Sequence, residues 1–435
     1  VFFEKRLMNK KQIYSWALYD WANSAFATTV MAGFFPIFFA QYWSNPDNLS
    51  VSTFYLGLGN SVASLIVALL APILGAIADR GSFKKKFLIF FAFLGIVMTL
   101  GLGFIAQGMW PIALMVYIFS TIGFSGANIF YDSLLPSVSN EENVDDVSAL
   151  GFSLGYLGGG ILIIINFLMI SYPASFGLVD AVEATKYAFI SVGVWWALFS
   201  LPLILFVDEP KYHESESVSD SIINGLIQFR NTFNDLKKLK VVATFLLAYW
   251  LYIDGVDTVV RMAANFAFTL GFDQASIMGA LVMIQLVAFF ATLIYIKIAN
   301  YIGLKNGIYM GILGYCIILF AGYFVESITH FYIVALLIGC FQGGIQTISR
   351  SLYSRIIPEK KSAEFYGFYN MLGKFAAVFG PVLMGSVTLV LSNVVEDEVK
   401  AARFGLLSII ILFILGAYVF SKVDIKEGEA MAKNL

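Results

Sequence analysis

Twelve apolar stretches of roughly membrane-spanning length follow one another along this chain of 435 residues. A helix needs about 20 apolar residues to cross a bilayer, and backbone groups in lipid are satisfied only inside a helix or a closed barrel. The composition agrees, because 59% of the residues are hydrophobic and only 13% are charged. We therefore predict an all-α membrane protein. The expected transmembrane helices are 13–43, 52–78, 87–107, 110–136, 149–170, 186–207, 240–270, 274–299, 306–325, 330–357, 362–392 and 403–422.

The basic residues are distributed unevenly among the loops between these helices. With the N-terminus inside the cell, 21 of the 27 Lys and Arg residues fall in cytoplasmic segments, three fall outside and three lie within helices. Positively charged loops stay on the cytoplasmic side, so both termini are predicted to be cytoplasmic. The loop 137–148 is an exception, because it is acidic although it is assigned to the cytoplasmic side. Segment 1–12 is basic, and the apolar run after it is too long for a cleavable signal peptide.

The longest polar interval, 208–239, divides the twelve helices six and six. We therefore expect an N-terminal half at 1–207, a cytoplasmic linker at 208–239 and a C-terminal half at 240–435. The two halves also share weak patterns, because Tyr131 to Pro136 at the end of one helix resembles Tyr353 to Pro358 at the end of another. Two six-helix repeats are a common plan of transporters, whose substrate site lies between the halves near the midplane.

The second part of the linker has the pattern of an amphipathic helix, with five apolar residues at helical spacing. These residues are Ile222, Leu226, Phe229, Phe233 and Leu236. Such a helix lies either on the cytoplasmic membrane surface or on the loops of the bundle itself.

The seventh helix carries the sharpest polar pattern. Asp254, Asp257 and Arg261 stand at i, i+3 and i+7, which places them on one narrow face, with Trp250 beside it. Asp257 and Arg261 are four residues apart and can neutralise each other. Asp254 lies deep in the membrane, where desolvation favours a neutral carboxyl and a nearby cation favours an ionised one. We predict that Asp254 takes and releases a proton; a structural ion pair between helices is the alternative.

The first and fourth helices carry polar residues on one face each. Asp20 and Asn23 share a face of the first helix, and Asn128 and Asp132 share a face of the fourth. Asp20 and Asp132 are expected at similar depth in the cytoplasmic half, as parts of a gate or a proton exit. For Asp132, capping at the rim of the bundle is the alternative.

The tenth and eleventh helices add two cations. Gln346 and Arg350 are four residues apart, and Arg350 is expected either to reach the cytoplasmic surface or to meet Asp20 or Asp254. Lys374 lies near mid-depth, where a lysine must pair or deprotonate. We predict a role for Lys374 in substrate or ion handling.

No cofactor is expected. Cys316 and Cys340 lie in apolar helices and are more typical of core residues than of a disulfide or metal site. His213 and His330 lie in a linker and at a loop edge, so zinc has no ligand set. An enzyme is disfavoured because the chain has no Cys/His site, no Walker loop and no soluble domain. The net charge of −2 gives no reason to expect nucleic-acid binding.

The loop after the second helix reads Gly75-Ala-Ile-Ala-Asp79-Arg80-Gly81 and resembles the signature loop of the major facilitator superfamily. The resemblance implies that Asp79 and basic residues such as Arg80 form a cytoplasmic latch between the halves. Ser82 and Phe83 stand where the usual loop has Gly and Arg.

Two further strings extend the resemblance. Gly151, Gly155 and Gly159 of the fifth helix are similar to an antiporter signature, which makes Gly75, Gly155 and Gly159 gating candidates. The string from Tyr14 to Thr28 resembles the bacterial transporters related to the vacuolar amino-acid effluxers of autophagy. The resemblance covers nearly the whole chain. It implies the major facilitator fold, with twelve transmembrane helices in two six-helix repeats, in the bacterial inner membrane.

Together these features predict a secondary active transporter that moves a small polar or zwitterionic solute, best an amino acid, by alternating access with proton coupling. Its partners would be the solute, protons and membrane lipids, and it would be a monomer. An exporter of lipids or amphiphilic drugs is the alternative, although Lys374 and Arg350 disfavour a mostly apolar path. In a non-transporting receptor or scaffold, the ionisable residues would have no purpose. The predicted substrate- or proton-binding residues are Asp20, Asn23, Asn128, Asp132, Trp250, Asp254, Asp257, Arg261, Gln346, Arg350 and Lys374.

Overall fold

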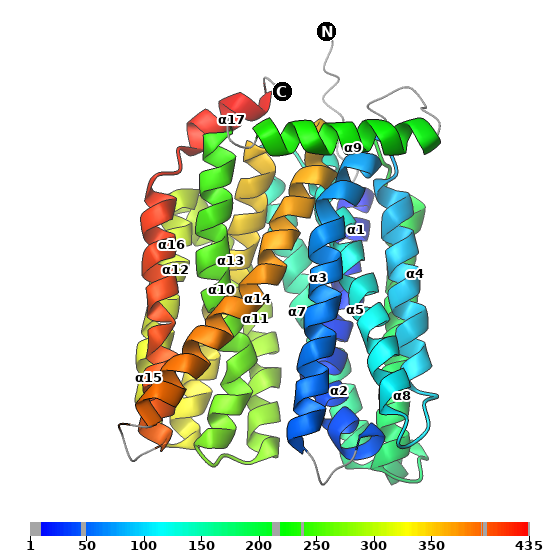
Figure 1. Cartoon of the computed structure of the whole chain (residues 1–435), viewed down its shortest axis with the longest axis vertical. Coiled ribbons are helices and arrows are strands. Elements are labelled where there is room, and N and C mark those ends of the chain that lie inside the picture. Colours follow the sequence, from blue (N-terminus) through cyan, green and yellow to red (C-terminus); the bar gives the residue numbers. More distant parts are fainter. Residues whose placement is uncertain are drawn as a thin grey trace.

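The computed structural model describes residues 10–44, 49–210, 218–235, 239–392, 394 and 398–433, and all regular structure in these ranges is helical (Figure 1). The N-terminal part contains α1 (Lys10–Ala25), the π-helical η1 (Phe26–Phe34), α2 (Phe35–Phe38), the π-helical η2 (Phe39–Trp43), α3 (Leu49–Gly81), α4 (Lys84–Leu102), α5 (Trp110–Ser133), α6 (Leu135–Val138), α7 (Val144–Ser171), the short η3 (Pro173–Phe176) and α8 (Ala181–Phe206). The remainder contains α9 (Val218–Asp235), α10 (Lys240–Thr269), α11 (Gln274–Ile302), α12 (Leu304–Tyr323), α13 (Ile328–Ile356), the short η4 (Glu359–Lys361), α14 (Ser362–Ser392), α15 (Glu398–Ser408), α16 (Ile410–Ser421) and α17 (Ile425–Lys433).

The predicted transmembrane helices are present, with ends within a few residues of those expected. Among the described residues, 11 segments are long and apolar enough to cross a membrane. The twelfth is the 31-residue α14, which runs through the bundle beside them (Figure 1). The first span is continuous from Lys10 to Trp43 through α1, η1, α2 and η2. The last span is divided into α15 and α16. The protein thus has the all-α, twelve-helix fold that the apolar pattern predicts.

Buried apolar side chains form two clusters, one on each side of the bundle. The first is drawn mainly from α1–α8 and includes Trp16 and Trp196, and the second is drawn mainly from α10–α16 and includes Tyr315 and Phe413. We call α1–α8 the N half and α10–α17 the C half. Ala149 of α7 is fully buried in the C-half cluster, so the two halves meet along part of α7.

Helix α9 lies across one end of the bundle, which we call the α9 end (Figure 1). Gly225 packs so closely on α3 that an added Cβ would lie 2.8 Å from the Ile77 Cα. Gln228 donates a hydrogen bond of 2.8 Å to the Glu364 carboxylate of α14, and Phe229 stacks on Phe368. Of the two predicted positions, the structure therefore shows α9 packed on the bundle, where it bridges α3 of the N half and α14 of the C half.

The outer face of α9 is apolar. Ile223, Leu226 and Ile227 are exposed there. Leu226 therefore points away from the bundle, whereas the sequence pattern predicted it on the same face as Phe229. The side chains of the other predicted apolar residues, Ile222, Phe233 and Leu236, lie outside the described residues.

The chain segment after α8 is anchored at the α9 end. Asp208 accepts a hydrogen bond from Gln12 at the start of α1. The Glu209 carboxylate accepts the backbone N–H groups of Lys84 and Lys85 at 2.8 and 3.0 Å, and so caps the first turn of α4. Burial raises the pKa of Glu209 above its usual value, against the opposing effect of these two N–H groups.

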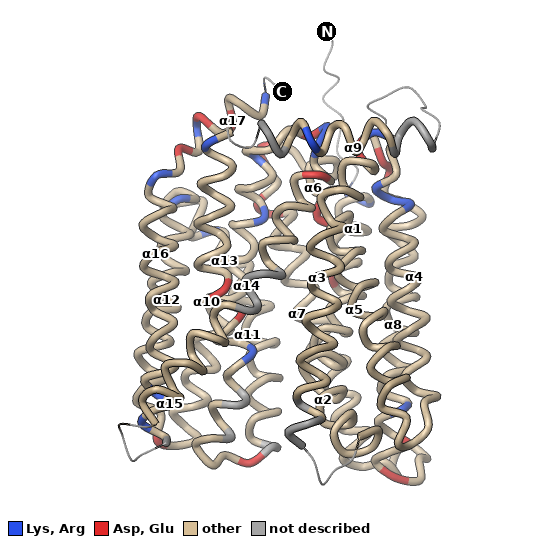
Figure 2. Tube along the Cα trace, viewed as in Figure 1, with Lys and Arg blue, Asp and Glu red and all other residues tan. Residues whose placement is uncertain are grey.

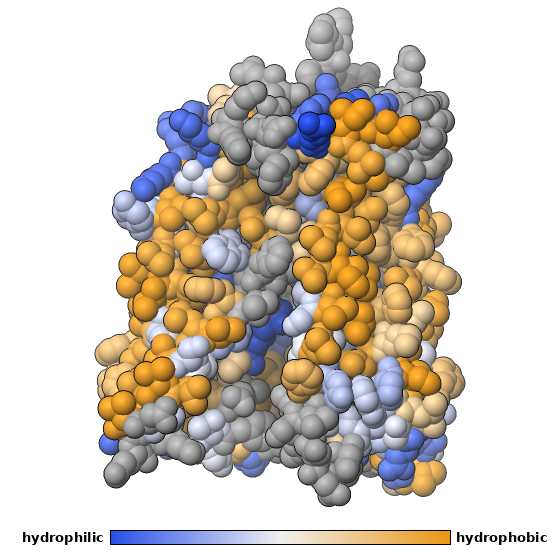
Figure 3. All heavy atoms as spheres, in the orientation of Figure 1, coloured by the Kyte–Doolittle hydropathy of each residue, from blue (hydrophilic) through white to orange (hydrophobic). Residues whose placement is uncertain are grey.

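The surface divides as expected of a protein in lipid. Charged residues gather mainly at the two ends of the bundle (Figure 2). Apolar atoms cover most of the visible surface between the ends, and hydrophilic atoms are visible in a hollow between the two halves (Figure 3).

Helices α3 and α14 meet closely near the α9 end and diverge toward the opposite end, the far end (Figure 1). A Cβ added to Gly75 would overlap the backbone of Ala363, and one added to Gly367 would lie 2.6 Å from the Ala71 carbonyl oxygen. Small residues at such crossings let helix backbones approach. The glycines therefore allow the two halves to close against each other at the α9 end.

Candidate functional site

Arg350 is the centre of the polar contacts between the two halves. It comes from α13, is 2% exposed, and its Nη1 lies 3.3 Å from Asp20 Oδ2 of α1 and 3.2 Å from Asp132 Oδ1 of α5. Its Nε and Nη2 donate to the hydroxyl and the carbonyl of Ser148 in α7, at 3.0 and 2.9 Å. One guanidinium of the C half thus joins three helices of the N half. Of the predicted partners of Arg350, the structure selects Asp20 and adds Asp132.

Three aromatic rings of the N half complete the surroundings of this guanidinium. Its carbon lies 3.9, 5.1 and 5.6 Å from the ring centroids of Phe152, Trp16 and Tyr131. Trp16 stacks on Tyr131, and the Tyr131 hydroxyl donates to Asp20 Oδ2 at 2.9 Å. We call the six N-half residues around the guanidinium the arginine cage. The cage consists of Trp16, Asp20, Tyr131, Asp132, Ser148 and Phe152.

The charges in the cage do not balance. Asp20 and Asp132 bring two carboxyl groups to one guanidinium. Asn370 of α14 donates to the second oxygen of Asp132 at 3.3 Å, but an amide adds no charge. Carboxyl groups that share a buried site do not both ionise readily. The arrangement therefore has a place for one exchangeable proton.

The polar contacts continue from the cage toward mid-depth. Asn23 donates to Asn128, which joins α1 to α5 within the N half. The Tyr156 hydroxyl of α7 donates to Gln346 of α13 at 2.7 Å, across the two halves. The predicted residues Asn23, Asn128 and Gln346 thus lie in the same polar region as Arg350.

Asp79 forms a second contact between the halves. Its carboxylate is 1% exposed and accepts the backbone N–H groups of Ala363 and Glu364, at 3.1 and 2.8 Å, in the first turn of α14. A carboxylate at this place satisfies free N–H groups and interacts favourably with the helix dipole. Lys84 lies 3.0 Å from Asp79 and donates to the Ser362 hydroxyl at 2.7 Å. Arg80 is half-buried beside this contact.

A third contact explains the acidic loop that disagreed with the charge pattern. Arg355 of α13 lies 2.6 Å from Asp145 at the start of α7. Asp145 is buried, so it serves as the partner of a basic residue of the opposite half. The sequence alone does not predict this pair.

Asp254 is buried between two helices of the C half. It is 1% exposed, and its Oδ1 accepts the Gly380 backbone N–H of α14 at 2.9 Å and the Thr258 hydroxyl at 3.3 Å. The residue after Gly380 is Pro381, whose ring disturbs the regular hydrogen bonding of the helix at this point. Asp254 therefore joins α10 to α14 within the C half.

The other predicted residues of α10 have different surroundings. Arg261 is exposed, and Asp257 and Trp250 are half-buried. The side chain of Lys374 lies outside the described residues.

Gly155 and Gly159 of α7 pack on α1 of the same half. A Cβ at Gly155 would lie 2.6 Å from the Ser24 hydroxyl oxygen, and one at Gly159 would lie 3.0 Å from Thr28. These glycines bring α7 close to α1 and so shape the N half. Only Gly75, of the three predicted gating glycines, lies at a contact between the halves.

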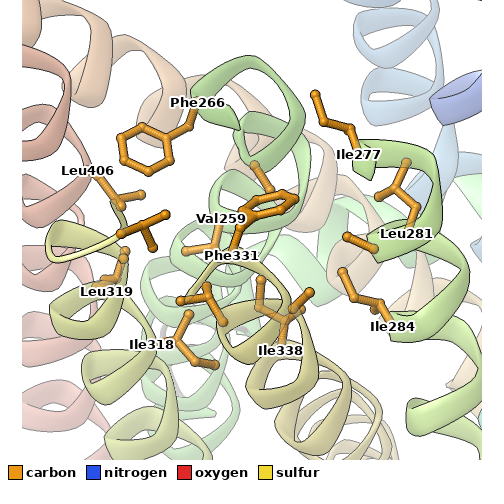
Figure 4. Close-up of a pocket in the computed structure, with 16 residues that line it drawn as sticks. Val259, Phe266, Ile277, Leu281, Ile284, Ile318, Leu319, Phe331, Ile338 and Leu406 are labelled. Atoms are coloured by element: carbon orange, nitrogen blue, oxygen red, sulfur yellow. The ribbon is translucent and has the colours of Figure 1, made fainter. Parts of the chain in front are cut away.

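One apolar pocket lies inside the C half, away from these polar contacts (Figure 4). Its walls include Val259 and Phe266 of α10, Leu281 of α11, Ile338 of α13 and Leu406 of α15. Among the described residues, no group of three or more His, Cys, Asp or Glu side chains is placed to hold a metal ion.

Residues 8–433 match the family described as "Vacuole effluxer Atg22 like". This chain belongs to the Atg22-like family. It is 38% identical over 415 residues, covering 95% of each chain, to the uncharacterized MFS-type transporter YxiO of Bacillus subtilis (strain 168). It is 23% identical to autophagy-related protein 22 of Yarrowia lipolytica, over 86% of this chain and 76% of that protein. The members of the Atg22-like family are transporters of the major facilitator superfamily and not enzymes.

Solved structures show the same fold. The proton:xylose symporter XylE has a TM-score of 0.70 with 15% identity, and the match covers 97% of this chain and 98% of that one. A bacterial homologue of the iron transporter ferroportin, in its outward-facing state, has a TM-score of 0.65 with 14% identity, over 95% and 98% of the two chains. The chain therefore has the major facilitator fold, as its signature loop implied.

Proposed function

We propose that this Atg22-like protein moves a small zwitterionic solute, best an amino acid, across a bacterial cell membrane by alternating access. The α9 end and both termini would face the cytoplasm. The orientation is supported by the positively charged segments at this end, such as the start of α4 at Lys84, Lys85 and Lys86.

The observation that carries the proposal is the position of Arg350 in a cage built by the other half. The guanidinium, the Asp79 contact and the Arg355–Asp145 pair all join the halves near the α9 end. Each contact forms or breaks as a unit when the halves rock, so the set favours one of two discrete states. Closure at the α9 end, with α3 and α14 diverging toward the far end (Figure 1), is one of the two states that alternating access requires.

Asp20 and Asp132 are the coupling groups in this proposal. In the closed state they share Arg350, and when the α9 end opens they lose that cation and gain access to water. A buried carboxyl that loses its cationic partner favours its neutral form, so opening promotes proton uptake. The charged and titratable groups that face the pair are Tyr131 of α5, Tyr156 of α7, Arg350 of α13 and Tyr366 of α14. Asp254 is assigned the structural role of joining α10 to α14.

An exporter of lipids or amphiphilic drugs is the alternative function. Such a substrate needs a mostly apolar path between the halves. The polar residues that cross the interface, from Asp132 through Arg350 to Gln346, favour a solute that carries charge.

Transport into proteoliposomes tests the proposal. Purified protein should take up labelled amino acids faster when a proton gradient is imposed than when it is collapsed. Asp20→Asn and Asp132→Asn should abolish gradient-driven accumulation, because these carboxyl groups carry the coupling proton. Asp254→Asn should retain gradient-driven accumulation. If only Asp254→Asn abolished accumulation, Asp254 and not Asp20 or Asp132 would be the coupling group.

A further inference from the structure

We propose that the arginine cage is the binding site for the cationic group of the substrate, and that Arg350 occupies it as an internal substitute while the α9 end is closed. The inference rests on the proposed transport function and specifies the ligand chemistry of its site. The ligand class is a zwitterion with a primary ammonium or guanidinium group and a carboxylate.

The cage has the composition of a cation site. The rings of Trp16, Tyr131 and Phe152 present their faces to one cation at 5.1, 5.6 and 3.9 Å, within the roughly 6 Å over which a ring attracts a cation. The carboxylates of Asp20 and Asp132 approach it at 3.3 and 3.2 Å. Aromatic faces with adjacent carboxylates are the groups that recognise ammonium and guanidinium ions.

All six groups of the cage belong to the N half, and the cation belongs to the C half. The cage is held together independently of Arg350, because Trp16 donates to the Tyr131 carbonyl at 3.0 Å and Tyr131 donates to Asp20 at 2.9 Å. When the halves separate at the α9 end, α13 withdraws Arg350 and the cage remains as a formed site. Two carboxyl groups without a cation are unfavourable at this depth, so the empty cage takes up a proton or a cation.

Withdrawal also frees the guanidinium of Arg350. In the closed state, the Nε and Nη2 of Arg350 donate to Ser148, and its Nη1 contacts the two aspartates. A free guanidinium presents these donors as a fork that fits a carboxylate. A zwitterion between the halves can therefore place its cationic group in the cage and its carboxylate on Arg350, which replaces one ion pair by two.

This arrangement also explains exchange with protons. The proton and the cationic group of the substrate compete for the same carboxyl pair, Asp20 and Asp132, and the closing movement of Arg350 displaces whichever of them is bound.

The test uses the purified full-length protein in detergent, with methylguanidinium as the probe. Arg350→Ala empties the cage, so methylguanidinium should bind with a saturable rise in Tm and at least about tenfold more tightly than to the wild type. Arg355→Ala is the matched control, since it removes the other ion pair from α13 but leaves the cage filled. Asp132→Asn added to Arg350→Ala should abolish the binding. Equal binding to Arg350→Ala and Arg355→Ala would overturn the inference.

A second measurement uses the wild type, so it does not depend on the folding of a variant. In proteoliposomes, uptake of a transported amino acid should be inhibited by other zwitterionic amino acids. It should not be inhibited by their N-acetyl derivatives, which lack the cation, and it should be inhibited more weakly by the corresponding amines, which lack the carboxylate. Equal inhibition by N-acetyl derivatives would overturn the cage assignment while transport stands. Absence of uptake for every amino acid would instead refute the proposed function.

Discussion

Removal of the Asp79 carboxylate, in Asp79→Ala, should open the α9 end. Asp79 accepts two backbone N–H groups of α14 and pairs with Lys84. Since Asp79 and Lys84 both belong to the N half, their ion pair persists when the halves separate. The two hydrogen bonds to Ala363 and Glu364 exist only in the closed state. Loss of these two bonds therefore favours the open state directly.

The size of the shift follows from the loss of the two hydrogen bonds to Ala363 and Glu364. Loss of a side-chain cap at a helix start typically costs about 1 kcal/mol and at most about 2 kcal/mol. A difference of about 1–2 kcal/mol changes an equilibrium by a factor of roughly 5–30, so the open population should rise by that factor. Loss of the Asp79–Lys84 ion pair lowers the stability of the protein by about 3–5 kcal/mol. Because Lys84 also donates to Ser362 of α14 across the two halves, opening relieves part of this cost and adds to the shift.

A single-cysteine reporter measures the shift. The native Cys316 and Cys340 are replaced by serine, and Ala149→Cys is introduced, because Ala149 is fully buried against the C half in the closed state. N-ethylmaleimide should then react with the reporter about 5–30 times faster in Asp79→Ala than in the parent. Transport should slow more than ligand binding weakens. Asp146→Ala is the control, because Asp146 is an exposed acidic residue at the same end.

Two results would refute this reasoning. An unchanged reporter rate would show that the Asp79 contacts do not favour the closed state. Equal losses of transport and of ligand binding would show that Asp79 supports the site as a whole and not the gate.

Two further substitutions test the closed α9 end with the same reporter. Gly75→Ala places a Cβ against the Ala363 backbone, so it should speed alkylation of the reporter and slow transport. Gly57→Ala is the control on the same helix, because a Cβ at Gly57 has nothing within 4 Å, and it should change neither rate. Equal effects of the two substitutions would contradict the role of the close helix contact at Gly75. Gln228→Ala removes the bond from α9 to Glu364 and should speed alkylation by a factor of about 2–10, the effect of roughly 0.5–1.5 kcal/mol; an unchanged rate would show that α9 does not hold the closed end.

The transmembrane helices could be predicted closely because each depends on a local property, an apolar run long enough to span lipid. The predicted helix at 362–392 coincides with α14 (Ser362–Ser392), although it contains Pro381 and Lys374. The polar stripe of the tenth helix was equally local, and it left Arg350 either reaching the cytoplasmic surface or meeting an aspartate. Which carboxylates would meet Arg350 depended on how the halves pack, and the sequence left Asp20 and Asp254 as equal choices.

The rest of the site depends on contacts between distant residues. Ser148 and Phe152 gave no signal, because a serine and a phenylalanine in an apolar helix are typical of packing. The role of Asp145 is visible only from its contact with Arg355, which is 210 positions away. Asp254 shows the limit of helical periodicity, which identifies a shared face but not the neighbour of that face. The neighbour of this carboxylate is the backbone N–H of Gly380 in α14.

Distance measurements between the halves test alternating access most directly. Spin labels at Lys86 and Lys426 report on the α9 end, and labels at Val179 and Glu326 report on the far end; all four positions are exposed. In lipid, addition of a transported amino acid should lengthen the first distance and shorten the second in the same fraction of molecules. Arg350→Ala should shift the populations in that direction without substrate. If the protein still transported but both distance distributions kept a single, unchanged peak, the account would be contradicted.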